Sequence, residues 1–77
     1  MNAKGILRLL IAKSDPDSLP LAERAINQYL DSTPATARKS GLCLLQDDVQ
    51  VQFNTLAGSQ RSFAETVNSY IEKKLAE

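Results

Sequence analysis

The side chains best suited to chemistry in this chain are one cysteine, Cys43, and two adjacent carboxylates, Asp47 and Asp48. A cysteine nucleophile is usually activated by a neighbouring histidine, and the 77 residues include no histidine. Adjacent turn carboxylates ordinarily serve turn formation and solubility, and a magnesium role requires further ligands. We therefore expect Cys43 to be a small packed hydrophobe, and the protein not to be an enzyme.

No pattern in the sequence indicates a metal or a cofactor. The common tetrahedral metal sites use histidines or clustered cysteines, and this chain has no histidine and one cysteine. The segment from Leu56 to Gln60 holds a single glycine, whereas phosphate-binding loops need several. We expect no metal, no cofactor and no intramolecular disulfide.

The charges are balanced, with nine Lys and Arg against nine Asp and Glu. A protein that grips nucleic acid by electrostatics is normally basic, with its charges on one face. Three helical segments followed by a hairpin would nevertheless begin a winged helix, which makes nucleic-acid binding through Arg38, Lys39 and Arg61 the alternative function. It is disfavoured because the recognition helix would span only about two turns.

The N-terminal segment from Ile6 to Ala12 is apolar but contains Arg8 and is followed by Lys13. A signal sequence has small residues after its apolar stretch, and a transmembrane helix needs about 20 apolar residues. Attachment to a membrane surface through Lys4 and Arg8 is disfavoured, because the core needs the opposite face of this helix. We expect no transmembrane segment and a cytoplasmic location, with which a lone cysteine agrees.

Helical periodicity predicts a first helix over residues 2 to 13, with Asn2 as its cap. Its apolar arc is so broad that only Lys4 and Arg8 mark a solvated side, so it must be covered from two directions. A second, half-buried helix should begin near Pro20 and end near Asp31.

Two further helical segments are expected, one before Gly41 and one after Arg61. A short helical turn should open at Pro34 and stop before Gly41, because proline suits a first helical position and glycine a terminator. After a Gly- and Ser-containing connection, Ser62 and Glu65 have the spacing of a capping box. The last helix is therefore expected to begin at Ser62.

Between Gly41 and Asn54 apolar residues recur at every second position, which predicts a β-hairpin with Asp47 and Asp48 at its turn. One face of the hairpin should pack on the helices, and the other should carry no charge. The packed face comprises Leu42, Leu44, Val51 and Phe53, which are expected to meet Ile6, Leu10, Ile26, Val67 and Ile71. The uncharged face comprises Cys43, Leu45, Gln50 and Gln52.

These elements predict one α+β domain over residues 1–77: two N-terminal helices, a short helical turn, a β-hairpin and a C-terminal helix. A chain this short buries only about 60 to 65% of its unfolded surface, so a partner subunit would widen its stability. We expect a small non-catalytic protein-protein interaction module, an adaptor, inhibitor or regulator of bacterial or phage type. It is expected to form a homodimer through the uncharged hairpin face, with Cys43, Leu45, Gln50 and Gln52 as partner-binding residues.

Overall fold

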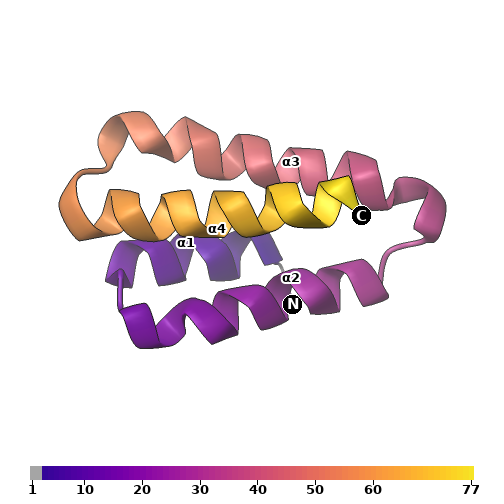
Figure 1. Ribbon diagram of the computed structural model, residues 1–77, viewed down its shortest axis with the longest axis horizontal. Helices are drawn as coiled ribbons and strands as arrows, with labels where there is room; N and C mark the ends of the chain where they lie inside the picture. Colours follow the sequence, from indigo (N-terminus) through magenta and orange to yellow (C-terminus); the bar gives the residue numbers. More distant parts are fainter. Residues whose placement is uncertain (1–2) are drawn as a thin grey trace.

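The computed structural model describes residues 3–77, and Asn2, the predicted cap of the first helix, lies outside them. Residues 3–77 form four helices that run back and forth along the long axis of the molecule (Figure 1). Short 3-10 turns stand at the three connections. The helices are α1 (Ala3–Lys13), α2 (Leu19–Asp31), α3 (Arg38–Gln52) and α4 (Gly58–Ala76). The 3-10 turns are η1 (Pro16–Ser18), η2 (Ala35–Ala37) and η3 (Phe53–Thr55).

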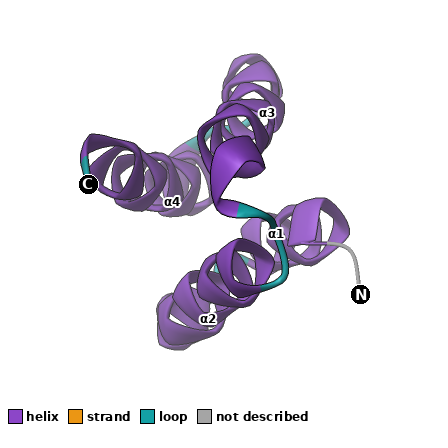
Figure 2. Ribbon diagram, turned by 90° about the vertical axis from the view of Figure 1, so that its right-hand side faces the viewer, coloured by secondary structure: helices purple, strands orange, loops and turns teal. Residues whose placement is uncertain are grey.

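Viewed from the end, the four helices stand around a common centre, with α1 beside both α2 and α3 (Figure 2). Contacts also join α4 to each of the other three helices. Helix α1 thus packs against all three other helices, but the expected cover of its broad apolar arc is incomplete, because Leu9 is 56% exposed. Leu7 and Ile11 of α1 are almost completely buried.

Helix α2 follows the sequence pattern closely. The carboxylate of Asp15 accepts a hydrogen bond from the backbone nitrogen of Asp17 at 3.0 Å, and Pro16 then opens η1. Ala22, Ala25 and Ile26 face the core. At the far end of α2, the hydroxyl groups of Ser32 and Thr33 donate to backbone carbonyls of the last turn, satisfying acceptors that a helix end leaves open.

The predicted α+β fold and its β-hairpin are wrong, because residues 38–52 form α3 and the described residues 3–77 contain no strand. Leu42, Leu45 and Val49 recur at helical spacing and are buried, so the helical period positions them. A helix satisfies its backbone hydrogen bonds internally, whereas an isolated two-stranded hairpin is marginal and leaves edges open. Only two residues between Leu42 and Gln52 are β-branched, and most of the others are good helix formers.

Gly41 is not the predicted terminator but an interior residue of α3, where the helix passes the side chain of Tyr29 on α2. A Cβ atom placed on Gly41 would lie 2.1 Å from the hydroxyl oxygen of Tyr29 and 2.8 Å from its Cζ. The glycine therefore permits a close approach of α3 to the tyrosine ring. Helix α4 also begins earlier than predicted, at Gly58 with a φ of 61°, so that Ser62 and Glu65 form no capping box.

The core contains most of the apolar positions expected from the helical segments. Leu10, Ile26, Leu42, Val67 and Ile71 are buried, as predicted. Leu44 and Val51, predicted to face the core, are instead exposed, because the helical period turns them outward. Ile6 and Phe53 are partly buried at the edge of the core.

Candidate interaction surface

A buried carboxylate joins α1 to α3. Asp48 is 8% exposed and receives two hydrogen bonds from the guanidinium group of Arg8. The Nε of Arg8 lies 3.0 Å from Oδ2, and its Nη2 contacts Oδ1. Lys4, one helical turn before Arg8, places its Nζ 3.7 Å from Oδ1. The side-chain amide of Gln52 donates to the backbone carbonyl of Asp48 at 3.1 Å.

This cluster shifts the pKa values of Asp48 and Arg8 in opposite directions. The hydrogen bond from Arg8 lowers the pKa of Asp48, and the positive charges of Arg8 and Lys4 lower it further, although burial acts in the opposite direction. The same hydrogen bond raises the pKa of Arg8. Each group stabilises the charged form of the other, so the pair is an ionic connection between α1 and α3 and offers no poised acid or base.

The helical period gives α3 an apolar stripe on its outer side. Leu44 is 69% exposed and Val51 is 71% exposed, and their separation of seven positions corresponds to about two turns. At about 100° per residue, Asp47 lies along one flank of this pair and Asp48 along the other. We call Leu44 and Val51 the outer stripe of α3. Among residues 3–77, the other large exposed hydrophobic residues are Leu9 and Leu21, one each on α1 and α2.

The two flanks of the outer stripe differ in charge. On one side, Lys4 and Arg8 surround the single carboxylate of Asp48, so that cations exceed carboxylates. Lys4 also lines a hollow together with Leu44, which places it directly beside the stripe. On the other side, Asp47 is exposed. The stripe therefore separates a positive flank from a negative one.

The four predicted partner-binding residues do not share one face, because they lie on a helix and not on a strand. Cys43 and Gln50 are exposed on the side of α3 near α4, where the amide nitrogen of Gln50 lies 3.4 Å from Oδ1 of Asn68. Leu45 is 5% exposed and belongs to the core, and Gln52 turns toward Asp48. The expectation that Cys43 is packed is also wrong, since its side chain is exposed.

The predicted nucleic-acid residues are not gathered either. Arg38 donates through Nε to the carbonyl oxygens of Leu30 and Thr33, at 3.0 and 3.1 Å. Arg61 lies near the start of α4, at the opposite end of the bundle from the start of α3 (Figure 1). Its Nε is 3.3 Å from Oε1 of Glu65. Two of the three predicted cations thus already have intramolecular partners, and no single basic face contains all three.

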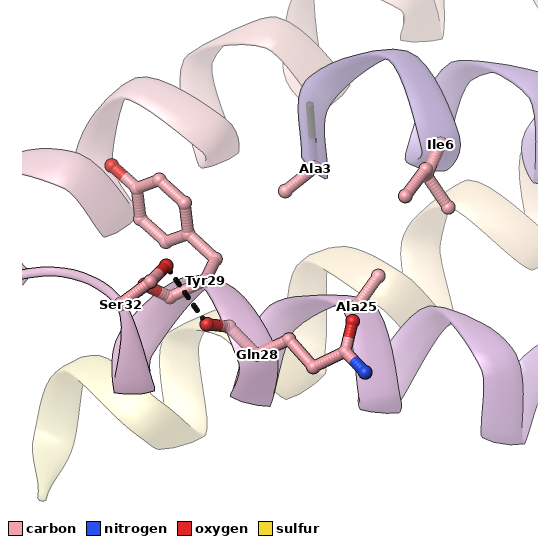
Figure 3. A pocket seen from close by; sticks show the side chains of 6 residues that line it. All are labelled: Ala3, Ile6, Ala25, Gln28, Tyr29 and Ser32. Carbon is pink, nitrogen blue, oxygen red and sulfur yellow. Dashed lines mark hydrogen bonds between the residues drawn. The ribbon is translucent and has the colours of Figure 1, made fainter. Parts of the chain in front are cut away.

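One hollow of the surface lies between α1 and α2. It has a volume of about 250 Å³. The side chains that line it, drawn in Figure 3, have no formal charge. Tyr29 stands at one side of it and Ile6 at the other. Among residues 3–77, no group of three or more His, Cys, Asp or Glu side chains is placed to hold a metal ion.

Sequence reasoning missed the two features that define the candidate surface. The spacing of Lys4 and Arg8 on one side of a helix was visible, but their partner Asp48 lies 40 residues after Arg8. The seven-residue spacing of Leu44 and Val51 was the available signal for an exposed stripe.

No family model, curated protein or solved structure matches this chain. Within residues 3–77, none of the helices combines the length and apolarity needed to cross a bilayer.

Proposed function

We propose that this protein is a small non-catalytic interaction module that associates with a second copy of itself through the outer stripe of α3. The observation that supports the proposal is the exposure of Leu44 and Val51, at 69% and 71%. The inner face of the same helix is already buried in the core through Leu42, Leu45 and Val49. Burial of such side chains against another chain removes apolar surface from water.

The charge pattern favours a particular orientation of the two copies. In a parallel pair related by a two-fold axis along the helices, the positive flank of one α3 faces the negative flank of the other. Asp47 would then meet the positive flank at Lys4 and Arg8 of its partner. In an antiparallel pair, like flanks would meet and repel. We therefore assign the parallel arrangement, in which Leu44 meets Leu44 and Val51 meets Val51.

The size of the surface sets the expected affinity. Helix α3 has 15 residues and is about 22 Å long. Stable interfaces bury about 800 Å² on each partner, more than one helix face of this length provides. The dimer should consequently be weak, with a fast exchange between monomer and dimer that depends on protein concentration.

Sedimentation velocity tests the proposal. The wild-type chain, with a monomer mass of 8.4 kDa, should show an average mass that rises toward twice that value between micromolar and millimolar concentration. Leu44→Lys should remain at the monomer mass over the same range. Leu21→Lys is the matched control, because Leu21 is also an exposed leucine, at 49%, but lies on α2. It should sediment like the wild type.

The charge assignment has its own test. Asp47→Lys should weaken the association, because two positive flanks would then meet. Adding Lys4→Glu should restore part of the loss, since the exchanged charges can pair again across the interface. A monomeric wild type at millimolar concentration, or equal effects of Leu44→Lys and Leu21→Lys, contradicts the proposal.

The exposed thiol of Cys43 bears on location. Unpaired exposed cysteines persist in reducing compartments and are oxidised elsewhere. A cytoplasmic location therefore belongs to the same proposal. Fractionation of the native cell, with the free thiol of Cys43 labelled before lysis by a membrane-permeant but not by an impermeant maleimide, tests it.

A further inference from the structure

A second surface feature lies at the end of the bundle where α2 leads into α3 and α4 finishes. It is a hollow of about 330 Å³ with an apolar floor and a charged rim. Leu42 is buried in the floor and Leu30 is partly buried beside it. The rim carries three cations, Arg38, Lys39 and Lys74, and one carboxylate, Glu77; Ala35 completes the lining. This volume is at the lower end of the range that small-molecule sites occupy.

The guanidinium group of Arg38 is held in place on this rim. Its Nε donates to two backbone carbonyls, those of Leu30 and Thr33. Within the described chain, its two terminal amino groups make no hydrogen bond or ion pair. A guanidinium fixed through Nε and open at both terminal nitrogens is prepared to bind a planar carboxylate with two hydrogen bonds.

Lys39 is a second cation on the rim of this hollow. It is exposed in the first turn of α3, where a positive charge opposes the helix dipole, and it forms no ion pair with any described residue. Lys74 approaches from α4, and its Nζ lies 3.6 Å from the carboxylate of Glu77. Glu77 is 60% exposed, so this contact is one that an entering anion can replace.

We infer that this hollow binds a small organic carboxylate that carries a short apolar chain. Arg38, with Lys39 and Lys74 beside it, would bind the carboxylate, and the apolar chain would lie on Leu30 and Leu42. The excess of cations on the rim sets the sign of the ligand, and the apolar floor requires more than an inorganic anion. The same chemistry is offered by a free short-chain acid and by the C-terminal residue of a peptide.

A titration followed by backbone amide NMR shifts tests the inference on the full chain. Hexanoate represents the free acid and N-acetyl-leucine represents the peptide terminus. Either should produce saturable shifts at the start of α3 and the end of α4, with a dissociation constant of millimolar order, as suits so few atoms. Stronger binding of one than of the other identifies the source.

Two further compounds separate the contributions of charge and apolar chain. Hexanamide keeps the chain without the charge, and acetate keeps the charge with almost no chain. Both should bind at least about fivefold more weakly than hexanoate, because each lacks one of the two contacts. The inference would be overturned if hexanamide or acetate bound as tightly as hexanoate. It would also be overturned if neither hexanoate nor N-acetyl-leucine produced saturable shifts.

Variants of the rim give opposite expected effects. Lys39→Gln and Lys74→Gln should each weaken hexanoate binding about two- to fivefold, while Glu77→Gln should strengthen it, because it removes the competing carboxylate. Arg38→Gln should have the largest effect, but it also removes two hydrogen bonds at the α2 end. The lysine variants therefore decide the case: unchanged affinity in both of them overturns the site. The hollow does not include the outer stripe of α3, so this test and the dimer test can fail independently.

Discussion

Helices α2 and α3 differ in how many of their large apolar residues are exposed to solvent. The outward positions of α2 are mostly polar, with Leu21 as its exposed large hydrophobe. Helix α3 has two such residues, Leu44 and Val51, and it places a carboxylate, Asp48, on its buried side. The apolar residues of α2 thus chiefly serve the core, whereas α3 serves the core and also presents apolar surface to solvent.

Folding and association can therefore be separated by substitutions on different sides of one helix. Burial of Ala22, Ala25 and Ile26 explains α2 without any partner. Exposure of Leu44 and Val51 adds nothing to the stability of the monomer, because apolar groups gain only when they leave water. Substitutions on the two sides of α3 should therefore have effects of different kinds.

The largest expected effect comes from two neighbouring leucines of α3. Leu45→Lys should lower the free energy of unfolding by about 4 kcal/mol or more, because it places a charge in the core where Leu45 is 5% exposed. Leu44→Lys should change the same quantity by less than about 0.5 kcal/mol at micromolar concentration. Urea denaturation followed by circular dichroism measures both. Similar losses for the two variants would contradict the distinction between the inner and outer sides of α3.

The next effect concerns the buried carboxylate. Asp48→Asn keeps the shape of the side chain but removes the charge that receives the hydrogen bonds of Arg8, and should lower the free energy of unfolding by about 1–2 kcal/mol. Asp47→Asn is the control on the adjacent, exposed position and should stay within about 0.5 kcal/mol of the wild type. Equal stability of the two variants would remove the proposed role of the ion pair.

The same carboxylate predicts how stability depends on pH. Because the folded pKa of Asp48 is lower than its unfolded value of about 3.9, the unfolded chain takes up the proton first as the pH falls. The stabilisation is fully present above the unfolded pKa and is lost as the pH drops through the folded one. The difference in unfolding free energy between the wild type and Asp48→Asn should shrink below about pH 5. A constant difference down to pH 3 would contradict this account.

A smaller effect is expected at the contact between α2 and α3. Gly41→Ala would bring a Cβ to 2.1 Å from the hydroxyl of Tyr29, so the ring must move. The displacement outweighs the better helix propensity of alanine and should leave a net loss of about 1 kcal/mol. Gly5→Ala is the matched control, because an added Cβ at Gly5 of α1 meets nothing within 4 Å and should stabilise the chain. Thermal unfolding of the two variants in parallel would show opposite shifts.

The sequence predicted the helices whose apolar pattern allows one interpretation. The first two helices were confirmed, and so were the buried positions of Leu10, Ile26, Val67 and Ile71. Helix α3 was misread because Leu42, Leu44, Val49 and Val51 fit a period of two while Leu42, Leu45 and Val49 fit the helical period. The glycine at position 41 strengthened the error, since it imitates a helix terminator.

The candidate surface was beyond prediction for a different reason. The ion pair between Arg8 and Asp48 joins residues 40 positions apart, and nothing local in the sequence indicates that these two charges meet. The outer stripe depends on knowing that α3 is a helix, because the hairpin interpretation placed Leu44 and Val51 in the core. The hairpin interpretation also placed Cys43, Leu45, Gln50 and Gln52 together on one face. On the helix that α3 forms, these four residues do not share a face.

The most direct test of self-association through α3 is disulfide cross-linking. In a Cys43→Ser background, Val51→Cys should form a disulfide-linked dimer on mild oxidation, because a parallel two-fold contact brings residue 51 of both copies together. Leu21→Cys in the same background should stay largely monomeric. A Val51→Cys chain that cross-links no faster than Leu21→Cys would contradict the account.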